Sequence, residues 1–69
     1  DSGMEESLVE HIALRDAIAS LPQRERMVIV LRYYRGFTQE RTARVIGVSQ
    51  VQVSRIERKA VQHLREKLL

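Results

Sequence analysis

The chain has 69 residues, 43% of them hydrophobic, no cysteine and a net charge of +3 at pH 7. A chain of this length forms one domain at most and has a thin core, because it buries only about 60% of the surface that its unfolded form exposes. The missing cysteines exclude disulfides and thiolate metal sites, and they fit a cytoplasmic protein. The longest apolar run, Met27–Leu31, is far too short to cross a bilayer, so we expect no membrane partner.

The charge is spread unevenly along the chain. Residues 1–22 hold five acidic residues and one arginine, a net charge of −4, whereas residues 23–69 hold eleven lysines and arginines against four glutamates, a net charge of +7. A strongly basic segment attracts polyanions, and an acidic segment is repelled by them. The second two-thirds of the chain are therefore expected to bind nucleic acid; the alternative is an ordinary solvated basic surface.

The first half of the sequence favours two helices. Residues 1–3 read as a frayed or artificial chain end, and a domain is expected over residues 4–69. Apolar residues at helical spacing predict a first helix that ends at Pro22, a residue suited to the first turn of the next helix. That second helix is expected over Gln23–Tyr34, closed by Gly36. Its expected buried residues are Val28, Ile29, Leu31 and Tyr33.

The second half favours two more helices. Thr38 offers a side-chain oxygen that would cap a third helix ending at about Ile46. Ser49 and Gln52 fit the S-x-x-Q capping box and predict the start of a fourth helix over residues 50–68. The expected buried residues of this helix are Val53, Ile56, Ala60, Leu64 and Leu68. The sequence shows no strand pattern, so the predicted fold class is all-α, with four helices.

The third and fourth helices have the spacing of a helix-turn-helix over residues 38–69. Ala43 is expected to face the crossing helix, where a larger side chain would hold the two helices apart. Gly47 lies in the turn, where a positive φ would be costly for a residue with a Cβ atom. Val48 and Val53 are expected to fill the gap between the helices. Ile46 and Ile56 would complete this small core.

One polar face of the fourth helix should point outward when its apolar residues point inward. This face would carry Gln50, Val51, Ser54, Arg55 and Arg58. Glutamine can read adenine, arginine can read guanine, and valine can contact the methyl group of thymine. The pattern therefore predicts a helix that reads bases in the major groove; the alternative is an ordinary exposed polar face.

Several runs of residues are typical of one protein family. They are Leu21-Pro-Gln-Arg-Glu-Arg-Met-Val-Ile, Leu31-Arg-Tyr-Tyr, Thr38-Gln, Gly47-Val-Ser-Gln and Val53-Ser-Arg-Ile-Glu-Arg-Lys-Ala. With them the chain resembles region 4 of bacterial RNA polymerase sigma factors from about Leu14 to Leu69. The run Ser49-Gln-Val-Gln-Val-Ser-Arg is especially similar to alternative sigma factors of the stress-response and sporulation groups. The resemblance implies binding to the upstream (−35) promoter element and a role in directing transcription initiation.

The resemblance also implies roles for single residues. Gln50, Val51 and Arg55 match the base-reading positions of the family. The positions that approach the phosphate backbone are matched by Arg24, Arg32, Thr38, Gln39, Glu40, Gln52 and Lys59. Glu40 would do so through its main-chain N–H at a helix N-terminus, since phosphate would repel its carboxylate.

Two protein partners follow from the same resemblance. The family grips the flap-tip helix of the polymerase β subunit, here with an apolar surface from Ile12–Ile18 and Met27–Tyr34; the alternative is that these residues are simply core. An anti-sigma factor is the second expected partner, and the acidic helix Glu5–Asp16 is its candidate contact. Two other functions stay open: the DNA-binding domain of a free-standing helix-turn-helix regulator, and an interaction module whose main ligand is an inhibitor.

Two residues of the third helix depart from the family pattern. Arg41 stands where an acidic residue is usual, so it cannot form a reciprocal capping box with Thr38. Thr42 stands where a branched apolar residue is usual, so apolar area is lost from the helix packing. A slightly weaker third helix is expected, with Arg41 facing solvent; the alternative is that Arg41 adds a phosphate contact.

No catalytic or metal-binding grouping is apparent in the sequence. His11 and His63 are far apart and lack clustered acids, and His63 is expected on the solvent face of the fourth helix. Glu25 fits a helix-start charge better than a catalytic acid. The sequence has no Gly-rich phosphate loop. We expect no enzymatic activity, no cofactor and no metal ion.

Overall fold

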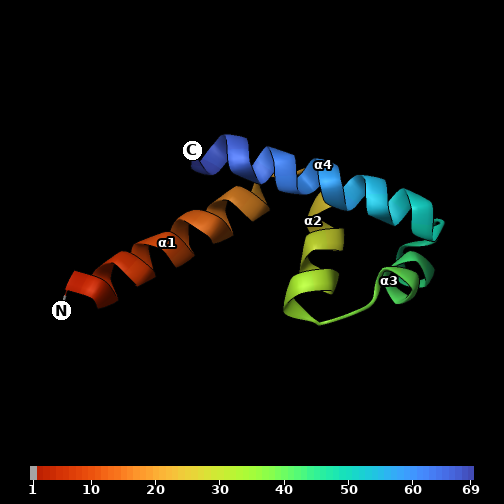
Figure 1. Ribbon diagram of the computed structural model, residues 1–69, viewed down its shortest axis with the longest axis horizontal. Helices are drawn as coiled ribbons and strands as arrows, with labels where there is room; N and C mark the ends of the chain where they lie inside the picture. The colour runs from red at the N-terminus through yellow and green to blue at the C-terminus, as the bar shows by residue number, and fades with distance from the viewer. Residues whose placement is uncertain (1) are drawn as a thin grey trace.

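The computed structural model describes the backbone of residues 2–69 and the side chains of residues 9–69. The elements are α1 (Ser2–Ala19), α2 (Gln23–Ile29), the π-helical turn η1 (Val30–Tyr34), α3 (Gln39–Ile46) and α4 (Gln50–Leu68). Residues 2–69 contain no strand. The predicted all-α class with four helices is confirmed, and α3 and α4 form a helix-turn-helix at one end of the domain (Figure 1).

Helix α4 is the element against which the others pack. It contacts α1, α2 and α3, and Figure 1 shows α2 descending from it toward α3 while α1 extends away toward the N-terminus. The domain measures 44 × 22 × 15 Å. Figure 1 shows that its length comes from α1 and α4 together, which leaves the N-terminal part of α1 without a neighbouring helix.

The helix boundaries are close to the predicted ones at both ends of α1. The helix begins at Ser2, two residues before residue 4, at which the predicted domain starts, and the prediction for residue 1 lies outside the described residues. Pro22 is the N-cap of α2 with φ −53° and ψ 149°, so it precedes the first turn instead of occupying it. Its carbonyl accepts the first hydrogen bond of the helix, from the Arg26 N–H at 2.9 Å.

A π-helical turn at the end of the second helix was not predicted. The Arg35 N–H donates to the Val30 carbonyl at 3.0 Å, five residues back, and the Phe37 N–H donates to the Leu31 carbonyl at 2.9 Å. Gly36 follows with φ 70°, so its predicted role in ending the helix is confirmed. Side chains in a π turn leave the α-helical register. The prediction that Tyr33 is buried is wrong for this reason, since Tyr33 is 59% exposed.

Two hydrophobic clusters form the core, and each includes a residue of α4. The first holds Ile18, Leu21, Ile29 and Ala60, with Leu14, Val30, Val61 and Leu64 packed against it. The second holds Val28, Ala43 and Val53, with Ile46, Val48 and Ile56 packed against it. The predicted helix-turn-helix core is thereby confirmed. Leu68 is 45% exposed, contrary to prediction, because it lies one turn beyond Leu64, the last α4 residue in the first cluster.

Hydrogen bonds close both ends of the α3–α4 turn as predicted. Gly47 has φ 78°, and the N–H groups of Gly47 and Val48 both donate to the Ala43 carbonyl, at 2.9 and 3.0 Å. Ser49 Oγ accepts from the Gln52 N–H at 3.1 Å, and Gln52 Oε1 accepts from the Ser49 N–H at 3.2 Å. These reciprocal bonds are a complete capping box and fix where α4 begins.

The two unusual residues of α3 both have partners. Thr38 Oγ1 caps the helix by accepting from the Arg41 N–H at 3.0 Å. Arg41 is exposed as expected, and its guanidinium also lies 4.1 Å from the centre of the Phe37 ring, a cation–π contact. Thr42 is fully buried, and its hydroxyl donates to the Thr38 carbonyl at 2.8 Å. The polar atom of Thr42 is therefore satisfied inside the core.

Candidate nucleic-acid interface

The five residues predicted to form the reading face of α4 lie together. Val51 is 61% exposed, Gln50, Arg55 and Arg58 are exposed, and Ser54 is half-buried. These residues, with Gln39 from α3, line one shallow depression of about 410 Å³. Amide, hydroxyl, guanidinium and branched apolar groups thus converge on one surface, where they are free to hydrogen-bond base edges or contact a thymine methyl group.

The capping box explains the orientation of this surface. It starts α4 at Gln50, so Val53 and Ala60 point into the core, where both are 0% exposed. Gln50, Val51, Ser54, Arg55 and Arg58 then lie on the opposite side of the helix from these two core residues. Gln52 has a different local role, because its side chain is held in the capping box by the Ser49 N–H.

The residues predicted to approach phosphate fall into three groups. Arg24, Glu40 and Lys59 are exposed. Thr38 and Gln52 are also exposed, but their side-chain oxygens cap α3 and α4. The third group consists of two half-buried residues, Arg32 and Gln39, whose side chains point inward to a common partner.

That common partner is Glu57, for which the sequence predicted no role. Its Oε1 accepts from Arg32 Nε at 2.7 Å and from Gln39 Nε2 at 3.4 Å, and its Oε2 accepts from the Tyr33 hydroxyl at 3.0 Å. Arg32 also donates through Nη1 to the Phe37 carbonyl at 2.7 Å. Glu57 therefore ties η1 and α3 to α4. Its partners lie 18 to 25 residues away in the chain, so no local sequence pattern signals this role.

The ionisation of Glu57 follows from these contacts. Burial alone would raise the pKa of its carboxyl group. Hydrogen bonds from Arg32, Tyr33 and Gln39, together with the positive charge of Arg32, outweigh burial and hold this pKa below its ordinary value of 4.5. The hydrogen bond to Glu57, with burial, raises the pKa of Tyr33 above 10.0. Glu57 is thus a stable anion and Tyr33 a stable hydroxyl donor at neutral pH.

A second tie joins α2 to α4 through His63, and it corrects the prediction that this residue faces solvent. His63 is half-buried, and its Nδ1 lies 2.6 Å from Oε1 of Glu25, which is only 7% exposed. Glu25 lies in the first turn of α2, where a negative charge is favoured. Among the side chains that the structure describes, no group of His, Cys, Asp or Glu is arranged to hold a metal ion.

The apolar surface predicted from Ile12–Ile18 and Met27–Tyr34 divides between core and exterior. Val28 and Ile29 are buried in the two clusters, whereas Ile12 and Tyr34 are more than half exposed. An apolar pocket of about 280 Å³ lies where α1 meets α2 and η1. Its lining residues are Arg15, Ile18, Ala19, Arg26, Val30 and Tyr34. Over residues 2–69, no helix has the length and apolar character needed to span a membrane.

Comparison with known proteins agrees with this geometry. The family profile "Sigma-70, region 4" matches residues 17–66. The chain is 44% identical over 61 residues to the RNA polymerase sigma-F factor of Bacillus subtilis (strain 168), covering 88% of this chain and 24% of that protein. It is 38% identical over 68 residues to the RNA polymerase sigma factor SigF of Mycobacterium tuberculosis (strain ATCC 25618 / H37Rv), covering 99% of this chain and 26% of that protein.

A third relative is the RNA polymerase sigma-B factor of Bacillus subtilis (strain 168), which is 38% identical over 64 residues, covering 93% of this chain and 24% of that protein. The chain spans about a quarter of the length of these curated relatives. The profile match includes every buried residue of the two hydrophobic clusters and the turn between α3 and α4. This chain therefore belongs to the Sigma-70, region 4 family.

Proposed function

We propose that this domain binds the −35 element of promoter DNA as part of an RNA polymerase sigma factor and so helps to direct transcription initiation. The observation that carries the proposal is the convergence of Gln50, Val51, Ser54, Arg55 and Arg58 on one surface of the helix that follows the turn. Family membership supports this function over a free-standing regulator. The net charge of +7 over residues 23–69 supplies the attraction to a polyanion.

Base reading and phosphate contact are divided among different residues in this proposal. Gln50, Val51 and Arg55 read bases, with Ser54 and Arg58 at the edge of the same surface. Arg24 and Lys59 contact phosphate with exposed cationic side chains. Thr38, Gln39, Glu40 and Gln52 lie near the N-termini of α3 and α4, where the positive end of the helix dipole favours phosphate oxygens. Arg32 supports this surface from inside, through Glu57.

The polymerase contact is proposed at the apolar pocket between α1, α2 and η1. An apolar helix such as the flap tip of the β subunit would bury Ile12, Met27 and Tyr34, which this domain leaves exposed. An anti-sigma factor is proposed to compete for the domain and to contact the acidic helix Glu5–Asp16. The site of action is the bacterial cytoplasm, at the nucleoid. The domain itself performs no catalysis.

Selection from random duplexes tests the proposal. The domain is incubated with a randomised duplex pool, with and without a peptide of the β-flap tip, and the bound sequences are determined. A preferred hexamer is expected, with more duplex retained when the peptide is present. The Lys67→Ala variant is the control for a general loss of charge. It removes one exposed charge at the C-terminal end of α4, away from the proposed reading surface. Enrichment of no sequence would contradict promoter reading, and an enriched hexamer without peptide binding would favour a free-standing regulator.

A further inference from the structure

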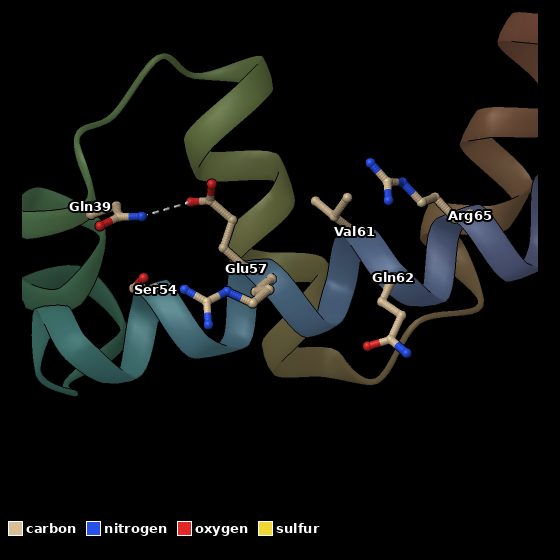
Figure 2. Close-up of a pocket in the computed structure, with 7 residues that line it drawn as sticks. Gln39, Ser54, Glu57, Val61, Gln62 and Arg65 are labelled. Carbon is tan, nitrogen blue, oxygen red and sulfur yellow. Dashed lines mark hydrogen bonds between the residues drawn. The ribbon is translucent and has the colours of Figure 1, made fainter.

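Glu57 places a negative charge beside the proposed DNA-reading surface. With Gln39, Ser54 and Arg58 it lines a surface hollow of about 650 Å³, and those three residues also line the reading depression. Figure 2 shows the Gln39 amide directed at the Glu57 carboxylate, with Ser54 near both. A carboxylate next to a phosphate-binding surface opposes DNA binding by charge repulsion. We therefore ask which contacts of Glu57 offset this repulsion.

Two contacts of Glu57 do so, one with Arg32 and one with Gln39. The Glu57 side chain is 15% exposed and the Arg32 side chain 26%, and their 2.7 Å bond makes the two a neutral pair. Arg32 is held further by the Phe37 carbonyl, so its charge is not presented to DNA as a separate cation. The Glu57 Oε1 that accepts from Arg32 also accepts from Gln39 Nε2 at 3.4 Å, and this bond restrains an amide at the edge of the reading depression.

We propose, on the basis of the proposed function, that Glu57 is a specificity-determining residue. It neutralises Arg32 and so keeps binding to arbitrary DNA weak, and it holds Gln39 in position beside Ser54 and Arg58 for binding to the preferred duplex. Sequence-independent affinity comes from unpaired cations that meet phosphates. Affinity for one sequence gains from side chains that are ordered before binding. Glu57 therefore increases the ratio of the affinity for the preferred duplex to the affinity for arbitrary DNA, although it contacts no base.

Two variants separate the charge effect from the positioning effect. Glu57→Gln keeps the shape of the side chain and removes its charge, which leaves Arg32 as an unpaired cation. Glu57→Asp keeps the negative charge near Arg32. It withdraws the carboxylate by one methylene from all three partners, and the 3.4 Å bond from Gln39, the longest of the three, is the first to be lost. Glu66→Gln is the matched control, because it removes one acidic charge from an exposed position of the same helix. Dissociation constants are measured for the selected duplex and for a scrambled duplex over a series of salt concentrations.

For Glu57→Gln, we expect the salt dependence on the scrambled duplex to steepen by about 0.9 in the log–log slope, which is roughly eightfold in affinity per tenfold change in salt. For Glu57→Asp, we expect an unchanged slope and a preference for the selected duplex that falls about five- to tenfold. Glu66→Gln is expected to leave the ratio of the two affinities unchanged. Circular dichroism at the working temperature confirms that each variant is folded.

If Glu57→Gln is unfolded, Gln39→Ala takes its place, since it removes the positioned amide and leaves the Arg32–Glu57 pair intact. It should lower the preference without changing the slope. The inference would be overturned if both Glu57 variants kept the wild-type preference for the selected duplex and the wild-type salt dependence. The same result in Glu57→Asp and Gln39→Ala would also overturn it. In either case the proposed function would stand. Failure of the wild-type domain to prefer any duplex would instead overturn the proposed function.

Discussion

His63 on α4 and Glu25 on α2 meet at a distance of 2.6 Å and join two helices whose contact residues lie 38 positions apart in the chain. Glu25 is 7% exposed, so its carboxylate depends on this partner for hydrogen bonding. We expect Glu25→Ala to lower the free energy of unfolding by about 1–3 kcal/mol, measured by urea denaturation. In a double-mutant cycle with His63→Ala, a coupling energy near zero would show that the contact does not stabilise the domain.

The ion pair of Glu57 gives the stability of the domain a defined pH dependence. Its folded-state pKa lies below the ordinary value of 4.5, so its contribution is fully present above pH 4.5 and is lost as pH falls through the lower, folded-state pKa. The wild type should therefore be more stable than Glu57→Gln at pH 7, and this advantage should shrink below pH 4.5. Urea denaturation across this range measures it. An advantage that stays constant down to pH 2 would exclude Glu57 as the titrating group.

Arg55 provides the sharpest test of base reading. Arg55→Ala should cost about 1–3 kcal/mol of binding to the selected duplex and relax the preference at one base position. Lys59→Ala is the matched comparison, since it should weaken binding to all duplexes alike and reduce the salt slope by about 1. Binding to the selected duplex and to single-base variants is measured by fluorescence anisotropy. Equal losses on every duplex for Arg55→Ala would make Arg55 a phosphate contact.

Gly47 isolates the cost of the turn conformation. A Cβ atom at this residue would meet nothing within 4 Å, so a substitution is penalised by its φ of 78° and not by crowding. Gly47→Val should lower the free energy of unfolding by about 1–2 kcal/mol or more, because a branched side chain disfavours the left-handed region. Gly47→Asn should cost less, since asparagine tolerates this region. Equal melting temperatures for Gly47→Val and the wild type would contradict the turn geometry.

Thr42 tests whether the unusual sequence of α3 weakens the helix. Its buried hydroxyl donates to the Thr38 carbonyl, which also accepts the Thr42 N–H at 2.9 Å. Removing the hydroxyl therefore leaves that carbonyl satisfied, and Thr42→Val should raise the free energy of unfolding by up to about 1 kcal/mol. Thermal unfolding of both proteins measures the difference. A lower melting temperature for Thr42→Val would show that the hydroxyl stabilises α3.

Local patterns were sufficient for the parts of the fold that depend on neighbouring residues. The cap at Thr38, the turn at Gly47 and the box formed by Ser49 and Gln52 each require residues at most five apart, and all were predicted. They also sufficed to predict which side chains of α4 gather on one surface, because the start of α4 determines which of them point outward. The resemblance to the family was stated from the same runs of residues and is confirmed by the profile match.

Predictions failed where a residue depends on distant parts of the chain or on a change of helix type. Nothing in the sequence around Glu57 indicates its partners in η1, so no role was predicted for it. Nothing around His63 indicates its partner in α2, so His63 was predicted to face solvent. Tyr33 was assigned to the core because an uninterrupted α-helix was assumed, and the π turn moved it to the surface. The assignment of single residues to bases or phosphates stays a prediction.

The two hydrophobic clusters share α4, and this has a mechanical consequence. Val53 in one cluster and Ala60 in the other lie seven residues apart, about 10 Å along one unbroken helix. The apolar pocket near the first cluster and the proposed reading surface near the second are therefore joined by one continuous helix. A protein bound at the pocket would therefore set the direction in which α4 approaches the duplex.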